Sequence, residues 1–256
     1  MENKKIDFSE KRTKNCEELM GPELRPLLDL PLDGKIAKSK EIIKEALQKY
    51  PKMGLGFSGG TDSLVLLHLA LPLIPKDMPI VFINTQNEFP ETCAFIEKIR
   101  KSWNLKNFIE VKAEQNKIQD FVDKFGFKTP EFTTACCNYH KIAPMTKVIG
   151  DLGLNGFFVG LRGVEHEERA KEFLFSPRQN PSHIRAHPLL FWRTGDVLEY
   201  VKQHDIECNP LYAQGYTSLG CVLCTEKNFN SSAHERVGRG AVREEIMKRL
   251  RDLGYT

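Results

Sequence analysis

Short apolar runs alternate with amphipathic stretches from residue 53 onward, and this alternation is typical of βαβ units in a parallel sheet. The apolar runs predict strands at residues 53–57, 79–84, 108–111 and 156–160. The stretches between them predict helices at residues 61–73, from residue 90, at 118–125 and at 142–149. The run at 79–84 is too apolar for a strand with one face in water. We therefore expect a doubly wound, mostly parallel α/β sheet.

The same pattern divides the chain into three parts. Residues 1–50 are charged and predict a helical N-terminal extension, whose apolar face is formed by Ile42, Ile43, Ala46, Leu47 and Tyr50. Residues 51–240 form the main domain, and residues 241–256 form a C-terminal helical tail. Beyond residue 185 the alternation is less regular, with helices expected at 196–203 and 242–253. We expect this last region to close over the ligand edge of the sheet.

Composition and charge narrow the class of protein. The 256 residues suffice for a core of their own, and 41% hydrophobic with 28% charged residues is typical of a globular protein. The net charge is only +3, which argues against a dedicated nucleic-acid-binding protein. No apolar run approaches the roughly 18 residues of a membrane span, and the first residues lack the apolar core of a signal peptide. We therefore expect a cytoplasmic protein with no membrane partner.

Seven cysteines in a chain without a secretion signal favour metal binding or redox chemistry over structural disulfides. Four of them form two tight pairs, which are Cys136 with Cys137 and Cys221 with Cys224. Four thiolates satisfy the tetrahedral preference of zinc, but adjacent cysteines are awkward ligands for one tetrahedral ion. An iron–sulfur cluster offers several irons, so neighbouring cysteines can bind neighbouring corners. Spacing alone leaves both metals open, along with the possibility that these cysteines are small buried apolar residues.

A second motif lies between the first expected strand and the first expected helix. Its residues are Ser58, Gly59, Gly60, Thr61, Asp62 and Ser63. The two glycines let the backbone approach an anion closely, and the amides and dipole at the start of a helix favour negative charge. The loop lacks the Gly-Lys-Ser/Thr ending of a Walker loop and is not a G-x-G-x-x-G fingerprint. It predicts a phosphate site, with a capped glycine turn as the simpler alternative.

These motifs resemble those of a known family. The loop is similar to the PP-loop of the adenine nucleotide α-hydrolases, which include ATP pyrophosphatases and sulfonucleotide reductases. The cysteine segments at 134–144 and 215–225 resemble those of cluster-bearing sulfonucleotide reductases of the phosphoadenosine phosphosulfate (PAPS) reductase family. Further similar segments are Phe89-Pro90-Glu91-Thr92, Gly160-Leu161-Arg162 with Arg169, Asn209-Pro210-Leu211 and Glu235-Arg236-x-Gly238-Arg239. The resemblance runs from about residue 50 to residue 240 and implies the Rossmann-like fold of this superfamily.

The resemblance also implies what residues 51–240 bind. It places an adenine nucleotide in the crevice, beside one [4Fe-4S] cluster whose ligands are Cys136, Cys137, Cys221 and Cys224. The nucleotide is expected to contact the PP-loop together with Arg162 and Arg169, because guanidinium groups bind anions by both charge and geometry. Lys141, Arg236 and Arg239 are expected to be catalytic. Lys141 follows Cys137 by four residues, so on a helix both side chains share one face.

The family's reaction reduces adenylyl sulfate or phosphoadenylyl sulfate to sulfite, leaving AMP or its 3′-phosphorylated form. A cysteine thiolate attacks the sulfate sulfur, and a thioredoxin- or glutaredoxin-like dithiol then releases sulfite. The family's attacking cysteine normally lies near the C-terminus, whereas no cysteine follows Cys224 here. Cys16, on a mobile N-terminal segment, is the candidate within this chain, and a partner protein is the other possible source. Assembly into a homo-oligomer is a further expectation.

Two other functions remain open. The PP-loop is closer to that of ATP pyrophosphatases than to the altered loops of many sulfonucleotide reductases. This favours, as an alternative, a sulfurtransferase that uses ATP, Mg²⁺ and a [4Fe-4S] cluster to thiolate tRNA or DNA, with Asp62 organising the metal and pyrophosphate. The third function is a non-catalytic module that senses nucleotide or redox state.

Overall fold

Six strands form one sheet in a computed structural model that describes residues 8–228 and 235–254 of the chain. The strands are β1 (Met53–Gly56), β2 (Ile80–Ile83), β3 (Phe108–Val111), β4 (Gly156–Phe158), β5 (Phe175–Arg178) and β6 (His183–Ala186). Their order across the sheet is β3-β2-β1-β4-β6-β5. All neighbours are parallel except β5 and β6, which pair antiparallel at one edge. The expected mostly parallel sheet and its four expected strands are confirmed.

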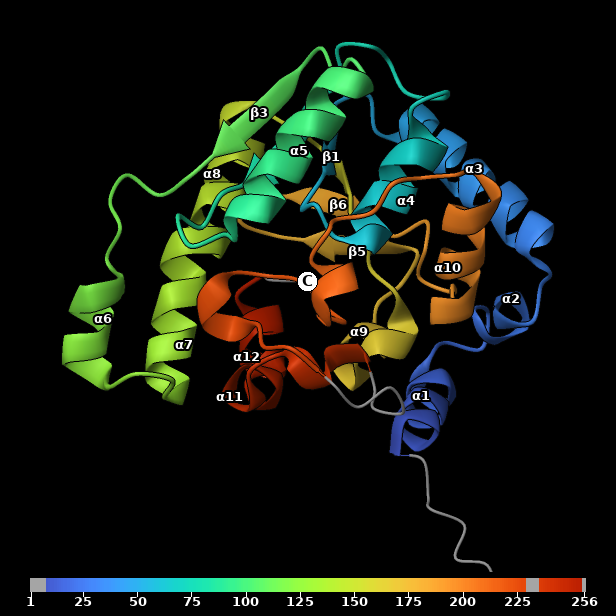
Figure 1. The fold of residues 1–256 in the computed structure, drawn as a ribbon. Helices are drawn as coiled ribbons and strands as arrows, with labels where there is room; N and C mark the ends of the chain where they lie inside the picture. Colours follow the sequence, from blue (N-terminus) through green and yellow to red (C-terminus); the bar gives the residue numbers. More distant parts are fainter. Residues whose placement is uncertain (1–7, 229–234, 255–256) are drawn as a thin grey trace, which may run out of the picture.

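Helices cover both faces of this sheet. They include α3 (Leu32–Lys49), α4 (Thr61–Ala70), α5 (Pro90–Ser102), α6 (Ile118–Phe125), α8 (Ala143–Asp151) and α10 (Thr194–Gln203). Because side chains alternate along a strand, Ile80 and Phe82 join the larger core with α3, α4, α5 and α10, whereas Val81 and Ile83 join a smaller core with α8. Figure 1 shows α4 and α5 on one side of the sheet and α8 on the other. The doubly wound arrangement follows from this alternation.

The elements that were not predicted from the sequence include one hairpin and one helix. The strands β5 and β6 form an antiparallel hairpin with arginine and histidine in short segments, so neither has an apolar run. Pro177 within β5 suits an edge strand, because proline lacks the amide hydrogen that a central strand requires. The other element is helix α7 (Pro130–Cys137), which begins with Thr129 accepting a hydrogen bond from the Phe132 amide. Its proline and cap residue were available signals for a helix start.

The N-terminal extension packs on the main core instead of lying apart from it. It consists of α1 (Phe8–Leu19), α2 (Arg25–Leu28) and α3. Arg193 donates hydrogen bonds to Glu17 Oε1 at 2.7 Å, to the Leu28 carbonyl and to Asp29 Oδ1 at 3.0 Å, and so fixes the extension at three points. Cys16 is fully buried in the larger core. The expectation of a mobile segment carrying Cys16 is therefore wrong.

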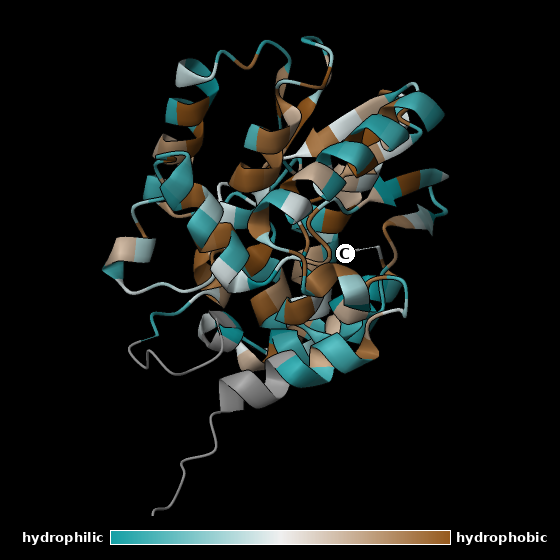
Figure 2. Cartoon of the chain, turned by 90° about the vertical axis from the view of Figure 1, so that its right-hand side faces the viewer, coloured by the Kyte–Doolittle hydropathy of each residue, from teal (hydrophilic) through white to brown (hydrophobic). Residues whose placement is uncertain are grey.

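The C-terminal region differs from its prediction in one respect. The helix expected at 242–253 is divided at Ile246 into α11 (Ala241–Glu245) and α12 (Met247–Asp252). Ile246, Met247 and Leu250 form a small core with Ile142 beside α7. The helices in Figure 2 alternate between brown apolar and teal polar residues, as expected for helices with one face on a core. Within the described ranges, no helix has the length and apolarity of a membrane span.

The buried hydrogen bond between Trp192 and Ser39 joins α3 to the segment that follows β6, and a substitution of Ser39 tests its contribution to stability. The Trp192 Nε1 donates to Ser39 Oγ at 2.9 Å, and Ser39 Oγ donates to the Pro188 carbonyl at 2.7 Å. Ser39→Ala leaves the indole N–H without an acceptor, so the free energy of unfolding should fall by about 1–3 kcal/mol in urea denaturation. The control Ser102→Ala, at the exposed end of α5, should change it by less than about 0.5 kcal/mol. An equally small effect of S39A would contradict this prediction.

Candidate active site

The PP-loop candidate, residues 58–63, joins the end of β1 to the first turn of α4. Gly59 has a φ of +75°, in the left-handed region that favours glycine. The Ser63 hydroxyl donates to the Gly60 carbonyl at 2.8 Å and accepts from the Ser58 amide at 3.2 Å. These bonds close the loop at the N-terminus of α4, where the helix dipole favours an anion.

Three residues from other segments support the loop. Asn209 Nδ2 donates to Thr92 Oγ1 at 3.1 Å and to the Gly59 carbonyl at 3.4 Å, which links the loop to α5. The Tyr212 hydroxyl accepts from the Thr61 amide at 3.0 Å. A Cβ on Gly160, just after β4, would lie 2.9 Å from the backbone of the loop at its Asp62 and Ser63 positions. Only glycine at 160 therefore allows the loop to pack against β4.

Arg162 supports the loop through Asp62. Its Nε donates to Asp62 Oδ1 at 2.7 Å and its Nη1 to Thr194 Oγ1 at 3.0 Å, and its side chain is 3% exposed. Arg162 lines neither of the two cavities described below. The charge of Arg162 holds Asp62 in place, and its expected nucleotide contact stays a prediction.

A cavity that is partly open to solvent lies over the loop, and we call it the loop cavity; the space among its lining atoms, open solvent included, is about 900 Å³. Residues of β2 and α8 form part of its wall, and residues from 212–220 and 236–239 line it as well, as expected for a C-terminal region that closes over the ligand edge. Its basic lining residues are Lys141, Arg169, Arg236 and Arg239. The structure thus brings four of the expected site residues to the loop.

Two buried carboxylates that the sequence analysis missed hold the arginines. Glu165 accepts from Arg169 Nη1, and its Oε1 lies 3.8 Å from Arg236 Nη1. Glu244 binds Arg236 with both oxygens, at 3.0 Å from Nε and 2.6 Å from Nη2. Burial opposes the ionisation of Glu165, but Arg169, Arg162 and Arg236 lower its pKa to about 2. The i,i+4 spacing of Glu165 and Arg169 was the signal in the sequence that pointed to this pair.

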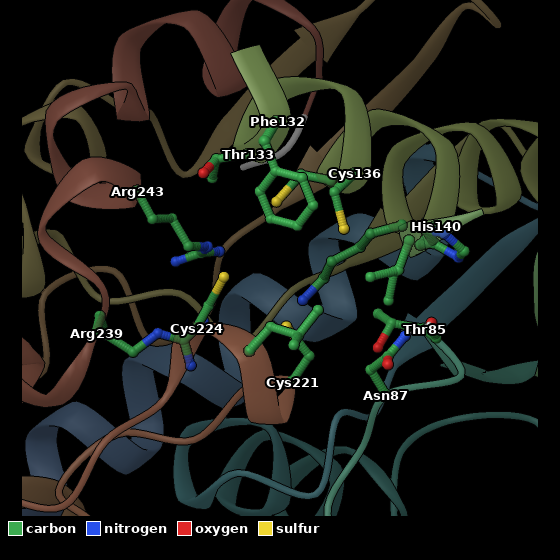
Figure 3. A pocket seen from close by; sticks show the side chains of 14 residues that line it. Thr85, Asn87, Phe132, Thr133, Cys136, His140, Cys221, Cys224, Arg239 and Arg243 are labelled. Carbon is green, nitrogen blue, oxygen red and sulfur yellow. Dashed lines mark hydrogen bonds between the residues drawn. The ribbon is translucent and has the colours of Figure 1, made fainter. Parts of the chain in front are cut away.

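The four paired cysteines line a second cavity, which we call the cysteine cavity. Cys136 and Cys137 end α7 and are followed by a π-helical turn, Asn138–Ile142. Cys221 and Cys224 flank a short 3-10 turn that is anchored by the Val222 amide donating to the Asn87 carbonyl at 2.8 Å. Figure 3 shows Cys136, Cys221 and Cys224 around one space, with two arginines on the side of Cys224. Two distant segments therefore present four sulfurs to one cavity.

The thiols of this cavity differ in acidity. A hydrogen bond from Cys224, helped by the charges of Arg239 and Arg243, lowers the pKa of Cys221 to about 6 although burial opposes it. Burial raises the pKa of Cys136 to about 12. Among the described residues, no three His, Cys, Asp or Glu side chains are placed to hold a single metal ion. The cavity thus brings four thiols together, and thiolates are the ligand type of an iron–sulfur cluster.

Lys141 and Arg239 line both cavities and form the boundary between them. Lys141 belongs to the π-helical turn that follows Cys137. Arg239 donates to Thr225 Oγ1 at 3.4 Å, and a Cβ on Gly220 would lie 2.1 Å from its Nη1. The missing side chain at 220 therefore leaves room for the guanidinium. The loop and the cysteine pairs share a boundary that carries two cations.

The other three cysteines line neither cavity. Cys16 is buried in the core, and Cys93 is exposed on α5. Cys208 lies near Thr61 of the loop, but burial raises its pKa, which disfavours the nucleophilic thiolate. No disulfide is formed by the seven cysteines, all of which lie in the described part of the chain.

Comparisons with known proteins identify similar sequences. A model of the phosphoadenosine phosphosulfate reductase domain matches residues 52–227. An adenosine 5′-phosphosulfate reductase of Staphylococcus haemolyticus is 30% identical over 217 residues, which cover 84% of this chain and 87% of that protein. Adenosine 5′-phosphosulfate reductase 1 of Bacillus subtilis is 26% identical over 210 residues, covering 80% and 88%.

Solved structures show the same fold. A phosphoadenylyl-sulfate reductase from Candida auris, in a phosphate complex, matches with a TM-score of 0.57 and 19% identity over 85% of this chain and 97% of that chain. A Candida glabrata FMN adenylyltransferase with FAD and inorganic pyrophosphate matches with a TM-score of 0.60 and 18% identity over 86% and 74%. At these identities the matches show a shared architecture alone.

The pH dependence of stability tests the ion pair between Glu244 and Arg236. Burial opposes its ionisation, but Arg236, with Arg243 and His166, lowers its pKa to about 2, against 4.5 without these neighbours. Its ionised form therefore stabilises the fold above pH 4.5, and this contribution is lost as the pH falls from 4.5 towards 2. Glu244→Gln should be less stable at neutral pH, and its deficit should shrink over that interval in urea denaturation. A deficit that stays constant would contradict the assignment, and the exposed Glu199→Gln should show no such change.

Proposed function

The chain belongs to the phosphoadenosine phosphosulfate reductase domain family and is a sulfonucleotide reductase, and we propose that it reduces adenylyl sulfate to sulfite and AMP. The relatives named as adenosine 5′-phosphosulfate reductases favour the substrate that lacks a 3′-phosphate. The observation that carries the proposal is the boundary of Lys141 and Arg239 between the loop cavity and the cysteine cavity. A nucleotide phosphate at the PP-loop would direct the attached sulfate towards this boundary.

Charge complementarity supports this orientation. The phosphate–sulfate anhydride carries negative oxygens at both ends, and the PP-loop supplies backbone and hydroxyl donors for the phosphate. Arg169 and Arg236 line the same cavity and are held by carboxylates. Lys141 and Arg239 lie further towards the cysteines, where the sulfate would be. In a site that excludes water, such fixed cations stabilise developing charge more strongly than in solution.

The reaction needs two thiols and produces one disulfide. A thiolate attacks the sulfate sulfur and forms an S–S bond, while the S–O bond to the AMP phosphate breaks and AMP leaves. A second thiol loses its proton and attacks the sulfur of the first thiol. The S–S bond to the sulfonate then breaks, and sulfite leaves with the electron pair. The sulfate sulfur gains two electrons, and the two thiols lose them.

We propose that a thioredoxin- or glutaredoxin-like protein supplies both thiols. Cys16, Cys93 and Cys208 line neither cavity, so none of them is placed to attack a sulfate at Lys141. The four remaining cysteines form the cluster site proposed below. An external dithiol satisfies the electron balance without a further cysteine in this chain.

We further propose that Cys136, Cys137, Cys221 and Cys224 hold one [4Fe-4S] cluster in the cysteine cavity. Thiolates are the ligands of such clusters, and the adjacent Cys136 and Cys137 suit neighbouring irons better than a single zinc ion. When bound, the cluster would supply a fixed charge distribution beside the sulfate. The thiols of the donor provide both electrons, so the role of this site is electrostatic.

The ion pair between Asp62 and Arg162 counts against the ATP-dependent sulfurtransferase. That function needs Asp62 to organise magnesium and pyrophosphate. In the structure Asp62 Oδ1 accepts from Arg162 Nε at 2.7 Å, so Arg162 already compensates part of its charge. This contact favours the reductase, in which Asp62 keeps the loop in shape.

A direct assay tests the reaction. Anaerobic protein with adenylyl sulfate and thioredoxin should release sulfite and AMP in equal amounts, and ATP with tRNA or DNA should yield no pyrophosphate. Lys141→Met should lower kcat/KM by about 10²-fold, because a fixed cation beside the sulfate is lost. The control Lys147→Met, on the exposed side of α8, should keep its activity. Pyrophosphate release without sulfite would support the sulfurtransferase, and binding without turnover would support the sensing module; either would refute the reductase.

Metal analysis tests the cluster separately. Anaerobically purified protein should contain about four irons and as much acid-labile sulfide per chain. Cys136→Ser and Cys221→Ser should lose most of both, whereas Cys93→Ser, which changes an exposed cysteine outside the cavity, should retain them. One zinc per chain, with neither iron nor sulfide, would refute the cluster.

A further inference from the structure

Glu165 lies at the centre of the arginines that surround the loop cavity. Its side chain is 5% exposed and ends a 3-10 turn, Gly163–Glu165, between β4 and α9 (Glu167–Ala170). One oxygen accepts from Arg169, and the other lies 3.8 Å from Arg236 Nη1 and 3.9 Å from Arg162 Nη2. A single carboxylate therefore faces three guanidinium groups, two from its own segment and one, that of Arg236, from the C-terminal region.

We propose that Glu165 is a positioning residue that orients Arg169 and Arg236 to bind the anionic part of the nucleotide. The inference rests on the proposed function, since it assigns Glu165 a part in binding the sulfonucleotide. Glu165 acts through the arginines, and the substrate itself carries the same sign of charge.

The geometry of arginine explains how a carboxylate can orient a substrate contact. A guanidinium is planar and its five donors point in fixed directions, so binding one side of the group fixes the others. Arg169 gives Nη1 to Glu165, and Arg236 gives Nε and Nη2 to Glu244 while its Nη1 faces Glu165. Both arginines line the loop cavity in these orientations. Without Glu165, Arg169 would lose the hydrogen bond that sets the plane of its guanidinium.

Glu165 is also connected to the PP-loop through Arg162. Its Oε2 accepts from the Arg162 amide at 3.3 Å, and Arg162 in turn holds Asp62 of the loop. One side chain thus connects the loop, α9 and the C-terminal region that carries Arg236. These segments are far apart in the sequence, so local helix or strand formation cannot set their relative positions.

Removing the charge of Glu165 has two opposite effects on the affinity for an anion, so a binding measurement can distinguish them. By electrostatics alone, loss of a carboxylate makes the cavity more positive and should tighten anion binding. By positioning, loss of the charge-assisted hydrogen bond to Arg169 and of the ion pair with Arg236 should weaken binding. Such bonds contribute enough to change an affinity by about 10- to 100-fold.

Calorimetric titration with AMP and with adenylyl sulfate distinguishes these effects. Glu165→Gln, which keeps the shape and removes the charge, should weaken both ligands by about 10-fold or more. In the sulfite assay KM should rise by a similar factor, while kcat stays within a few-fold, because Lys141 and Arg239 are unchanged. The matched control is Glu168→Gln, since Glu168 is a buried carboxylate on α9 that pairs with Lys171 and Arg251 away from the loop cavity. Its ligand affinity should equal that of the wild type.

A double-mutant cycle shows whether Glu165 acts through Arg169. In an Arg169→Met background, Glu165→Gln should weaken binding much less than it does alone. Should E165Q not fold, Glu165→Asp keeps the charge but shortens the side chain, and it should also weaken binding with little effect on kcat. Equal or tighter binding by the folded E165Q or E165D variant, or full additivity in the cycle, would overturn the inference while leaving the reductase intact. A wild-type protein that binds neither AMP nor adenylyl sulfate would overturn both.

Discussion

The site depends on one physical constraint, which is that a buried guanidinium must face a carboxylate or another acceptor. Removing an unpaired charge from water is too costly for a stable fold, and breaking such a pair leaves the other charge uncompensated. Arg162 and Arg236 are both 3% exposed; their partners are Asp62, near the start of the main domain, and Glu244, in the C-terminal tail. The Asp62–Arg162 pair fixes the PP-loop to the segment after β4, and the Arg236–Glu244 pair fixes the C-terminal cover. The loop cavity acquires its basic wall only when these segments come together.

The sheet order places this charge network where a ligand can use it. The chain passes from β1 outward to β2 and β3, then returns to β4 on the other side of β1, so the connections diverge at the carboxyl ends of β1 and β4. Ligands of open α/β sheets bind at such a divergence. Here the PP-loop follows β1 and Gly160 follows β4, and the absence of a side chain at 160 allows the two to touch. Topology therefore selects the position of the cavity, and the buried pairs determine its charge.

The sequence predicts the parts of this arrangement that are local. The apolar runs of β1 to β4, the helix after the loop and the two cysteine pairs can be read from spacing, because periodicity and turn chemistry act over a few residues. The β5–β6 hairpin has no apolar run, and the partners of Arg162 and Arg236 are decided by tertiary contact. The sequence motif that contains Arg162 does not reveal that its guanidinium pairs with Asp62 of the loop. The mobile segment expected for Cys16 fails for a similar reason, since its burial depends on contacts made by the whole N-terminal extension.

At the cysteine cavity, local irregularities of the backbone place charged side chains beside the cysteines. A regular α-helix would keep the same number of residues per turn beyond Cys137. The π-helical turn Asn138–Ile142 instead widens the helix directly beside the cavity. Lys141 lies in this turn and reaches both cavities. From the opposite side, Gly220 leaves space for Arg239 just before Cys221, and Arg239 also reaches both. An irregular turn thus follows Cys137, and a glycine precedes Cys221; each leaves room for the side chain of a cation. Because both cations stand between the sulfurs and the PP-loop, an anion spanning the two cavities would be bound at its phosphate by the loop and at its far end beside the cysteines.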